Sequence, residues 1–323
     1  QIRTNDTEYP YRQDSDFFYL TGYSEPGAAC IINPNDQEHP FTLFVLPQDP
    51  KKEVWTGWRL SFAETISLYG ADQAQDIALF ESESLTAMKS ASKVYSNLNH
   101  EREHQHKMLD LVSQVRKEVQ RKGGGPEGLE SIGSIVHSMR LIKDDHEIEL
   151  MQKASDISAE AHIKAMQACR PGMTEYQIQA ILESHFVFRG GSGPAYTSIV
   201  GAGDNATVLH YVKNRDTIVE GDLLLVDAAA EFDMYASDIT RTFPASGKFS
   251  DAQKALYAVV LNAQKAVVAA SKPGVTFQEL HDLDLKLLVE GMIEIGLLSG
   301  TVDEVIKDES YTDYFMHKTG HWL

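Results

Sequence analysis

The chain changes its pattern of apolar and polar positions near its middle. Before residue 120, short apolar runs alternate with turn-forming residues, and Ala28 to Ile32 and Phe41 to Leu46 read as strands separated by the turn-rich residues 33–36. Residues 62–69 and 109–119 have the apolar spacing of helices. This mixture predicts a small α/β domain at the N-terminal end.

A glycine-rich segment separates this part from the rest. Residues 122–128 read Lys-Gly-Gly-Gly-Pro-Glu-Gly, the most flexible composition in the chain, which predicts a domain boundary. The same composition is also compatible with a long surface loop. We predict a first domain at 1–127 and a second at 128–323.

The second domain begins with two predicted helices. Asp144 and Glu147 have the spacing of a capping box, and apolar residues then recur at helical spacing as far as Ala161. The Arg-Pro-Gly sequence at 170–172 ends this helix, and Thr174 starts the next one.

The same pattern recurs 102 residues later along the chain. Residues 161–179 match residues 263–281 at two alanines, at the Pro-Gly pair and at the threonine that follows it. Two copies of a helix pair, each followed by extended segments, predict a pseudo-symmetric α+β domain with helices on one side of an antiparallel sheet. Helix–Pro-Gly–helix is also a common arrangement, so a chance match stays open.

Composition narrows the class of protein. The chain has 323 residues, of which 42 % are hydrophobic, which is ordinary for a globular protein with room for two domains. Its net charge of −18, from 47 acidic and 29 basic residues, argues against a nucleic-acid or anionic-membrane surface. We find no apolar run near the ~18 residues that a membrane helix requires.

Cysteine usage favours a reducing compartment. Cys30 and Cys169 lie far apart and form neither a metal-binding spacing nor a disulfide framework. We therefore expect reduced thiols and a cytoplasmic location. The first residue is Gln rather than Met, so we expect the natural N-terminus to lie outside this sequence, and a targeting segment before it stays open.

Two aspartates are the strongest candidates for chemistry. Asp227 follows the apolar run Leu223 to Val226, and Asp238 belongs to the extended segment Ser237 to Phe243. If the turn between them centres on residues 232 and 233, Asp227 lies directly opposite Asp238, with Cβ atoms roughly 4.5–5.5 Å apart.

Two like charges opposite each other destabilise a ladder, so something positive must compensate or one carboxyl must hold a proton. A divalent cation bound by both aspartates is the economical explanation, since oxygen-rich sites suit manganese, magnesium and similar ions. A solvated hairpin with two surface acids is the alternative, and the apolar neighbours of both aspartates argue for burial.

Three histidines are further candidates. His210 follows the Gly-Ala-Gly turn at 201–203, and His317 and His321 stand in the last residues of the sequence. In an extended segment these two would lie ~13 Å apart, at ~3.3 Å per residue, so at most one could bind a given ion. A lone histidine is more often a core residue than a ligand, and sequence does not show convergence.

The sequence resembles the pita-bread metallopeptidases, and within them the aminopeptidase P (Xaa-Pro aminopeptidase) family. The resemblance is carried by VDAAAEFDMYASDITRTFP with FMHKTGHWL, and by TNDTEYPYRQDSDFFYLTGYSEPGA and MRLIKDDHEIELMQKA. It covers essentially the whole sequence. It implies that residues 1–127 form an α/β domain for oligomerisation and access to the active site, and that 128–323 form a pita-bread domain, truncated at its C-terminus.

The resemblance also implies roles for the candidates. Asp227 would bind one metal of a dinuclear pair, Asp238 would bridge both metals, and His321 would bind the second. His210 and His317 would hold the scissile carbonyl and the proline side of the substrate.

Aromatic residues complete the implied site. Tyr196 would lie beside the metal ligands with Thr240, and Tyr196 and Trp55 would serve substrate binding, Trp55 by reaching a neighbouring subunit's active site. Both aromatics are also compatible with simple packing. The family supplies two further glutamate ligands, expected beyond Leu323, and usually has glycine where Lys318 stands.

The implied function is metal-dependent removal of an N-terminal residue that precedes proline. Two divalent ions, manganese by preference because carboxylate-dominated sites favour hard cations, would hold a bridging hydroxide as the nucleophile. The expected partners are peptides with proline in second position and a homo-oligomer, a dimer or tetramer. A chain without the two further glutamates is expected to be inactive.

Two alternatives stay open. Prolidase cuts only Xaa-Pro dipeptides and uses the same ligands. A pita-bread domain that has lost its ligands can serve as a binding module, but Asp227, Asp238 and His321 are all present here.

Overall fold

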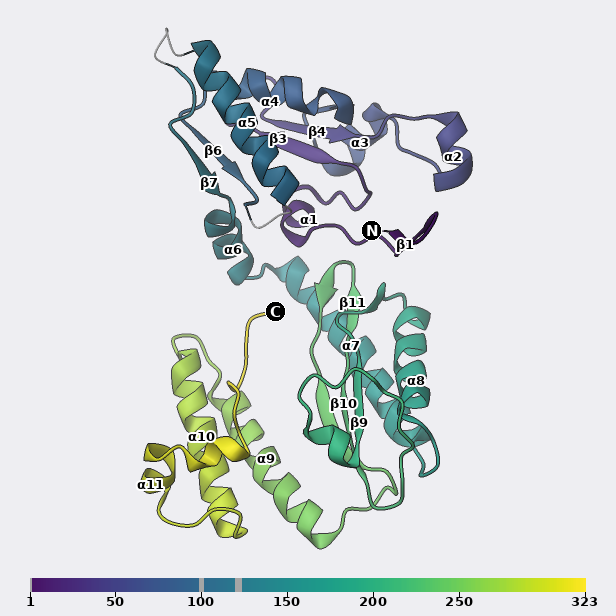
Figure 1. Cartoon of the computed structure of the whole chain (residues 1–323), viewed down its shortest axis with the longest axis vertical. Coiled ribbons are helices and arrows are strands. Elements are labelled where there is room, and N and C mark those ends of the chain that lie inside the picture. Colours follow the sequence, from purple (N-terminus) through teal and green to yellow (C-terminus); the bar gives the residue numbers. More distant parts are fainter. Residues whose placement is uncertain (1, 99–101, 120–123) are drawn as a thin grey trace. The chain divides into compact units, whose positions relative to one another are not determined.

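The computed structural model describes residues 2–98, 102–119 and 124–323, and the chain divides into two compact units, Gln1–Lys143 and Asp144–Leu323 (Figure 1). The division falls later than the boundary expected after residue 127. Residues 128–141 belong to the first unit because strand β7 (Gly128–Ser131) pairs with β6 (Lys93–Ser96) and helix α6 (Gly133–Leu141) packs near α1 (Ser15–Thr21). Residues 122 and 123 of the glycine-rich segment lie outside the described residues.

The first unit is α/β. A three-stranded sheet has the order β3-β4-β5, with β3 antiparallel and β5 parallel to the central strand, and β6 and β7 form a separate parallel pair. The remaining strands are β1 (Ile2–Thr4), β2 (Thr7–Glu8), β3 (Ala29–Ile32), β4 (Phe41–Val45) and β5 (Gln73–Asp76). The remaining helices are α2 (Pro50–Thr56), α3 (Phe62–Tyr69), η1 (Ile77–Leu79), α4 (Phe80–Met88) and α5 (Arg102–Val119). Both predicted strands and both predicted helices of this part are confirmed.

The central strand β4 is buried on both faces. Leu43, Phe44 and Val45 are successive residues and all are buried, although successive side chains of a strand point to opposite faces. Helices or loops therefore cover both sides of this sheet. A second apolar cluster joins α4 and α5 through residues such as Met88 and Val115.

The second unit combines two helix pairs with short antiparallel strands. The helices are α7 (Asp145–Ala168), α8 (Glu175–Phe188), η3 (Gly203–Thr207), α9 (Asp251–Ala270), α10 (Phe277–Glu294), α11 (Val302–Lys307) and η4 (Ser310–Asp313). The strands are β8 (Gly193–Pro194), β9 (Ile199–Ala202), β10 (Leu223–Asp227), β11 (Ala230–Phe232), β12 (Tyr235–Ala236) and β13 (Thr240–Pro244). They pair in the orders β13-β10-β9 and β12-β11-β8, antiparallel throughout.

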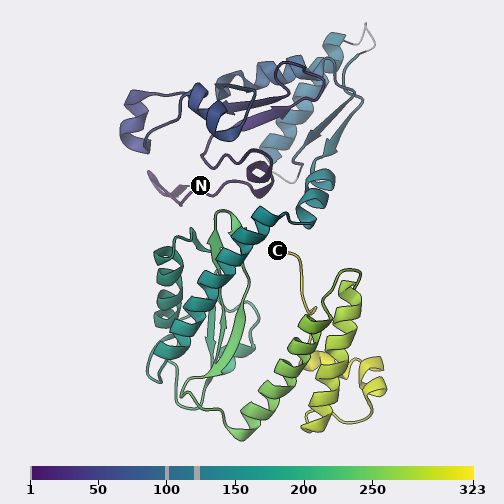
Figure 2. The same cartoon turned by 180° about the vertical axis from the view of Figure 1, so that it is seen from behind.

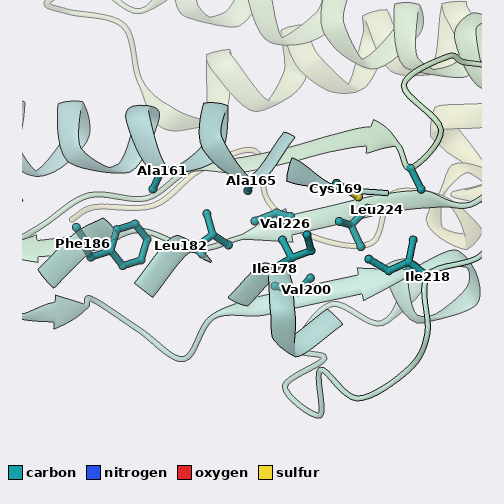
Figure 3. Packing of buried hydrophobic residues seen from close by; sticks show 14 of the residues in the cluster. Ala161, Ala165, Cys169, Ile178, Leu182, Phe186, Val200, Ile218, Leu224 and Val226 are labelled. Atoms are coloured by element: carbon teal, nitrogen blue, oxygen red, sulfur yellow. The ribbon is translucent and has the colours of Figure 1, made fainter. Parts of the chain in front are cut away.

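Helices α7 and α8 lie along one face of these strands, as the two opposite views show (Figures 1 and 2). On β10, Leu224 and Val226 are buried, while Leu223, Leu225 and Asp227 are only partly buried. The buried pair packs into a core with residues of both helices (Figure 3). Asp227 therefore lies on the face of the sheet that α7 and α8 leave open.

The predicted duplication of the helix pair is confirmed. Backbone and side chain bond reciprocally between Thr276 and Glu279 at the start of α10, and Thr174 N–H donates to Gln177 at the start of α8. Each pair turns at its glycine, with φ of +91° at Gly172 and +94° at Gly274. The second pair has a core of its own, in which α9 and α10 pack together.

The segment after the second helix pair differs from the expectation. Within the described residues, α10 is followed by the helices α11 and η4 where we predicted strands. Residues 315–323 contain no helix, as expected, but they form no strand either, and the chain bends at His317 and at Thr319. Among the described helices, none is both long enough and apolar enough to cross a membrane.

Candidate active site

The hairpin that carries the two aspartates has a different register from the predicted one. Asp233 and Met234 form its turn, with φ of +48° and +69°, the positive values that a two-residue type I′ turn requires. Asp227 consequently pairs with Thr240. The prediction that Asp227 lies directly opposite Asp238 was wrong, because it placed the turn one residue too early.

The two carboxylates nevertheless converge, as diagonal neighbours on one face can. The hydroxyl of Tyr196 lies 2.5 Å from Asp227 Oδ1 and 3.0 Å from Asp238 Oδ1. A phenol has a single hydrogen to donate, so it cannot fully satisfy two carboxylates at once. The two carboxylates thus compete for the Tyr196 hydrogen, and the Thr240 side chain forms a further hydrogen bond with Asp227.

The electrostatics of the pair are unfavourable for negative charge. Burial raises the pKa of Asp227, and the charge of Asp238 raises it further, while the hydrogen bond from Tyr196 acts in the opposite direction. Burial and the two neighbouring carboxylates also raise the pKa of Tyr196 well above its usual value. A cation held between the two aspartates would offset the repulsion between their charges and the cost of burying them.

His321 adds an imidazole to the pair. Its Nε2 lies 3.2 Å from Asp238 Oδ2, and its Nδ1 lies 2.9 Å from the carbonyl oxygen of Trp322. A carbonyl only accepts, so Nδ1 carries a hydrogen. In the neutral ring, Nε2 then presents a lone pair toward a carboxylate, and that contact is favourable only with a proton or a cation between the two atoms.

These donors fit a divalent metal in kind, with hard carboxylate oxygens and one imidazole nitrogen. Across residues 2–98, 102–119 and 124–323, however, no group of three His, Cys, Asp or Glu side chains is arranged to hold a metal ion. Tyr196 links Asp227 to Asp238, and Asp238 contacts His321. The three side chains are nevertheless not arranged as ligands of one metal ion. The arrangement is that of a partial metal site.

The other two predicted histidines lie outside this group of contacts. His210 is exposed in the loop after η3, and His317 is exposed with its Nδ1 2.9 Å from the carbonyl oxygen of Lys318. In the part of the chain that the structure describes, neither histidine forms a hydrogen bond or ion pair with Asp227 or Asp238. Lys318 is not among the positive-φ residues, so its backbone does not require glycine.

Trp55 lies in the first unit, on α2, with 87 % of its surface exposed. It is therefore not a core aromatic of its own unit, which removes the simple packing interpretation. Tyr196 is partly buried, and its hydroxyl contacts both aspartates, so Tyr196 lies within the candidate site.

The anchor of the loop that carries His210 is a part of the candidate site that the sequence did not indicate. Glu175, the first residue of α8, is completely buried, and both of its carboxylate oxygens accept hydrogen bonds from this loop and from β9. The donors are Ala202 N, Asn205 Nδ2, Tyr211 Oη and Asp216 N, at 2.7–3.0 Å. In the sequence, Glu175 reads only as an acidic residue in the first turn of a helix, where it complements the helix dipole.

A buried asparagine holds the far end of the same loop. Asn214 has a φ of +47°, its Oδ1 accepts from Val200 N at 3.0 Å, and its Nδ2 donates to Ser198 O at 2.8 Å. Glu175 and Asn214 together fix the loop against β9. No local sequence signal marks either contact, since their partners lie 14 or more residues away.

Comparison with known proteins places the chain in a family. Residues 149–323 match the profile of metallopeptidase family M24, and residues 1–95 match that of the aminopeptidase P N-terminal domain. The Xaa-Pro aminopeptidase of Haemophilus influenzae is 38 % identical over 321 residues, which cover 99 % of this chain and 72 % of the relative. The Xaa-Pro aminopeptidase of Escherichia coli is 35 % identical, with 99 % and 73 % covered.

Solved structures agree with this result. Aminopeptidase PepP of Pseudomonas aeruginosa has a TM-score of 0.96 and 41 % identity, covering 100 % of this chain and 73 % of that chain. A variant of Escherichia coli aminopeptidase P in complex with substrate has a TM-score of 0.94 and 35 % identity, covering 99 % and 73 %. The predicted architecture, an α/β domain followed by a pita-bread domain, is confirmed. The chain belongs to metallopeptidase family M24.

Proposed function

We propose that the protein is a metal-dependent Xaa-Pro aminopeptidase, which hydrolyses the bond between an N-terminal residue and a proline in second position. Membership of family M24 and 35–38 % identity with Xaa-Pro aminopeptidases support this activity. Prolidase is not favoured, because the relatives described above are aminopeptidases. A binding module without catalysis is disfavoured by the presence of Asp227, Asp238 and His321.

The observation that carries the proposed site is the convergence of Asp227 and Asp238 on the hydroxyl of Tyr196. Two carboxylates that compete for one hydrogen, beside an imidazole nitrogen of His321, form a place where positive charge is favourable. We assign Asp227, Asp238 and His321 as metal ligands, with two further glutamates from residues beyond Leu323.

The ions are divalent, and we propose two of them, with manganese preferred because hard oxygen donors dominate the set. When bound, such ions lower the pKa of water and polarise the carbonyl of the bond to be cleaved. His321 would bind through Nε2, since its Nδ1 hydrogen is held by the Trp322 carbonyl.

Specificity follows from the chemistry of proline. A peptide bond before proline is a tertiary amide, so its nitrogen has no hydrogen for recognition. We propose that His210 and His317 donate to the substrate at the scissile carbonyl and on the proline side. The amine of the first residue would lie near the carboxylates, which explains removal of a single N-terminal residue. Tyr196, and Trp55 of a neighbouring subunit, would contact the substrate.

We also propose that the first unit serves oligomerisation, as a homo-dimer or homo-tetramer, and access to the active site. The exposed Val54, Trp55 and Trp58 support a contact surface there. The free thiols of Cys30 and Cys169 support a reducing, cytoplasmic compartment.

The experiment that tests the activity compares two substrates with the full-length protein. We expect a tripeptide Xaa-Pro-Xaa to lose its first residue, and a chelator to abolish turnover until manganese is restored. Cleavage of the Xaa-Pro dipeptide alone would identify a dipeptidase. Stoichiometric metal without turnover of either peptide would support a binding module.

A further inference from the structure

A polar strip on α7 lies buried beneath the hairpin of the aspartates. Ser158 and His162 are one helical turn apart, with 0 % and 3 % of their surfaces exposed. They face Ala228 and Ala230, at the end of β10 and the start of β11, where two backbone hydrogen bonds, Ala228 N to Ile239 O and Ser237 N to Ala230 O, join the two sides of the hairpin. The strip therefore contacts the hairpin directly after Asp227 and directly before Asp238.

His162 holds the backbone next to the first aspartate. Its Nε2 lies 2.8 Å from the carbonyl oxygen of Ala228, the residue that follows Asp227. Because a carbonyl only accepts, Nε2 must carry the hydrogen and donate it. The position of the Asp227 backbone is therefore tied to the helix.

Ser158 holds both strands of the hairpin through a closed ring of hydrogen bonds. Ala230 N–H donates to Ser158 Oγ at 2.7 Å, and Ser237 Oγ–H donates to the carbonyl oxygen of Ala230 at 3.1 Å. The 2.8 Å contact between the two hydroxyls then requires Ser158 to donate to Ser237. Ser237 directly precedes Asp238, so this ring ties the second aspartate to the same helix.

Stability alone does not explain these polar residues. The neighbours of the strip on α7 include Ile157, Ala161 and Ala165, all completely buried and apolar. The Nδ1 of His162 has no hydrogen-bond partner among the described residues, and burying an unpaired polar atom costs free energy. What the strip adds to the backbone bonds of the hairpin is a link from α7 to the residue after Asp227 and to the residue before Asp238.

We propose that Ser158 and His162 are positioning residues that set the separation of the Asp227 and Asp238 carboxylates for metal binding. The inference rests on the proposed function, in which these aspartates are metal ligands. It extends to this chain the rule that hydrogen bonds behind metal ligands tune affinity, typically by about 10- to 100-fold.

The test is titration of the metal-free full-length protein with Mn²⁺ by calorimetry, together with thermal unfolding in the absence of metal. We expect His162→Leu and Ser158→Ala to weaken Mn²⁺ affinity by roughly 10- to 100-fold. His162→Gln, whose amide can donate to the Ala228 carbonyl, should recover most of the loss. Leu182→Ala is the matched control, because it opens the same core and removes no hydrogen bond to the hairpin backbone.

Each outcome bears on one claim. Wild-type protein that binds no Mn²⁺ would contradict the proposed function itself. Wild-type binding with unchanged affinity in both variants, and a thermal loss like that of Leu182→Ala, would overturn the positioning role while leaving the function intact. If His162→Leu does not fold, the smaller change Ser158→Ala decides by the same criterion.

Discussion

At the scale of single residues, the candidate site has more hydrogen-bond acceptors than hydrogens to satisfy them. One hydrogen of Tyr196 faces two carboxylates, and the Nε2 of His321 faces the carboxylate of Asp238. Asp227 and Asp238 stand out in the sequence because their motif is local, whereas His321 is singled out among the histidines only through the family resemblance. Ser158 and Glu175 could not be predicted, because in the sequence they are ordinary helix positions whose partners lie far along the chain.

The first residue-scale prediction concerns Asp238. We expect Asp238→Asn to abolish metal retention and peptide turnover in the full-length protein while the fold is kept, because the substitution removes the ligand that we propose both ions share and relieves like-charge repulsion. Elemental analysis and circular dichroism measure the two effects. Unchanged metal stoichiometry would refute the assignment of Asp238 as a bridging ligand.

The second concerns Asp227 and pH. Its pKa is raised in the folded protein, so the folded state favours the protonated carboxyl. The contribution of Asp227 to stability is therefore full below the unfolded pKa of about 3.9 and is lost as pH rises through the raised value. We expect metal-free Asp227→Asn protein to lack this loss and to melt at a higher temperature than wild type at neutral pH. A lower melting temperature would contradict the expected sign.

At the scale of elements, the strands β3 and β4 and the helix starts of the second unit could be predicted, because apolar spacing and capping boxes are local signals. The hairpin register could not. Asp233-Met234 lacks the Asn-Gly or Asp-Gly signature of a type I′ turn, yet both residues adopt positive φ. A shift of the turn by one residue moved the partner of Asp227 from Asp238 to Thr240.

This register predicts an unusual effect of glycine. Met234→Gly should stabilise the protein by about 1 kcal/mol, because a left-handed backbone costs roughly 1–2 kcal/mol for a residue other than glycine. In the register that the sequence indicated, Met234 would lie in a strand, where glycine destabilises. Urea unfolding gives the sign, with Tyr235→Gly as a strand control that should destabilise. Destabilisation by Met234→Gly would support the other register.

The loop carrying His210 depends on one buried carboxylate. Glu175→Ala removes the acceptor for four donors, so we expect a loss of roughly 3 kcal/mol or more in the free energy of unfolding. Tyr211→Phe removes one of these donors, together with the hydrogen bond that the same hydroxyl accepts from Asn205, and should cost less, about 1–2 kcal/mol. Chemical denaturation measures both. Equal effects of the two changes would show that Glu175 does not act as a common anchor.

At the scale of the whole molecule, the chain consists of an α/β unit and an α+β unit, which match two domain families. The class of both units could be predicted from local patterns. The place of their division could not be predicted from composition, because the pairing of β7 with β6 brings the residues after the glycine-rich segment into the first unit. The chain spans 72–73 % of the length of the bacterial relatives described above. We propose that the two further glutamate ligands belong to the part of the family's sequence that this chain does not span.

The central claim is that Asp227, Asp238 and His321 hold the catalytic metal ions. Anomalous scattering from crystals of the full-length protein grown with Mn²⁺ tests it most directly. We predict two adjacent peaks, with Asp238 contacting both ions, Asp227 one and His321 Nε2 the other. Anomalous peaks elsewhere, or none at the aspartates while Tyr196 still bonds to both carboxylates, would contradict the account.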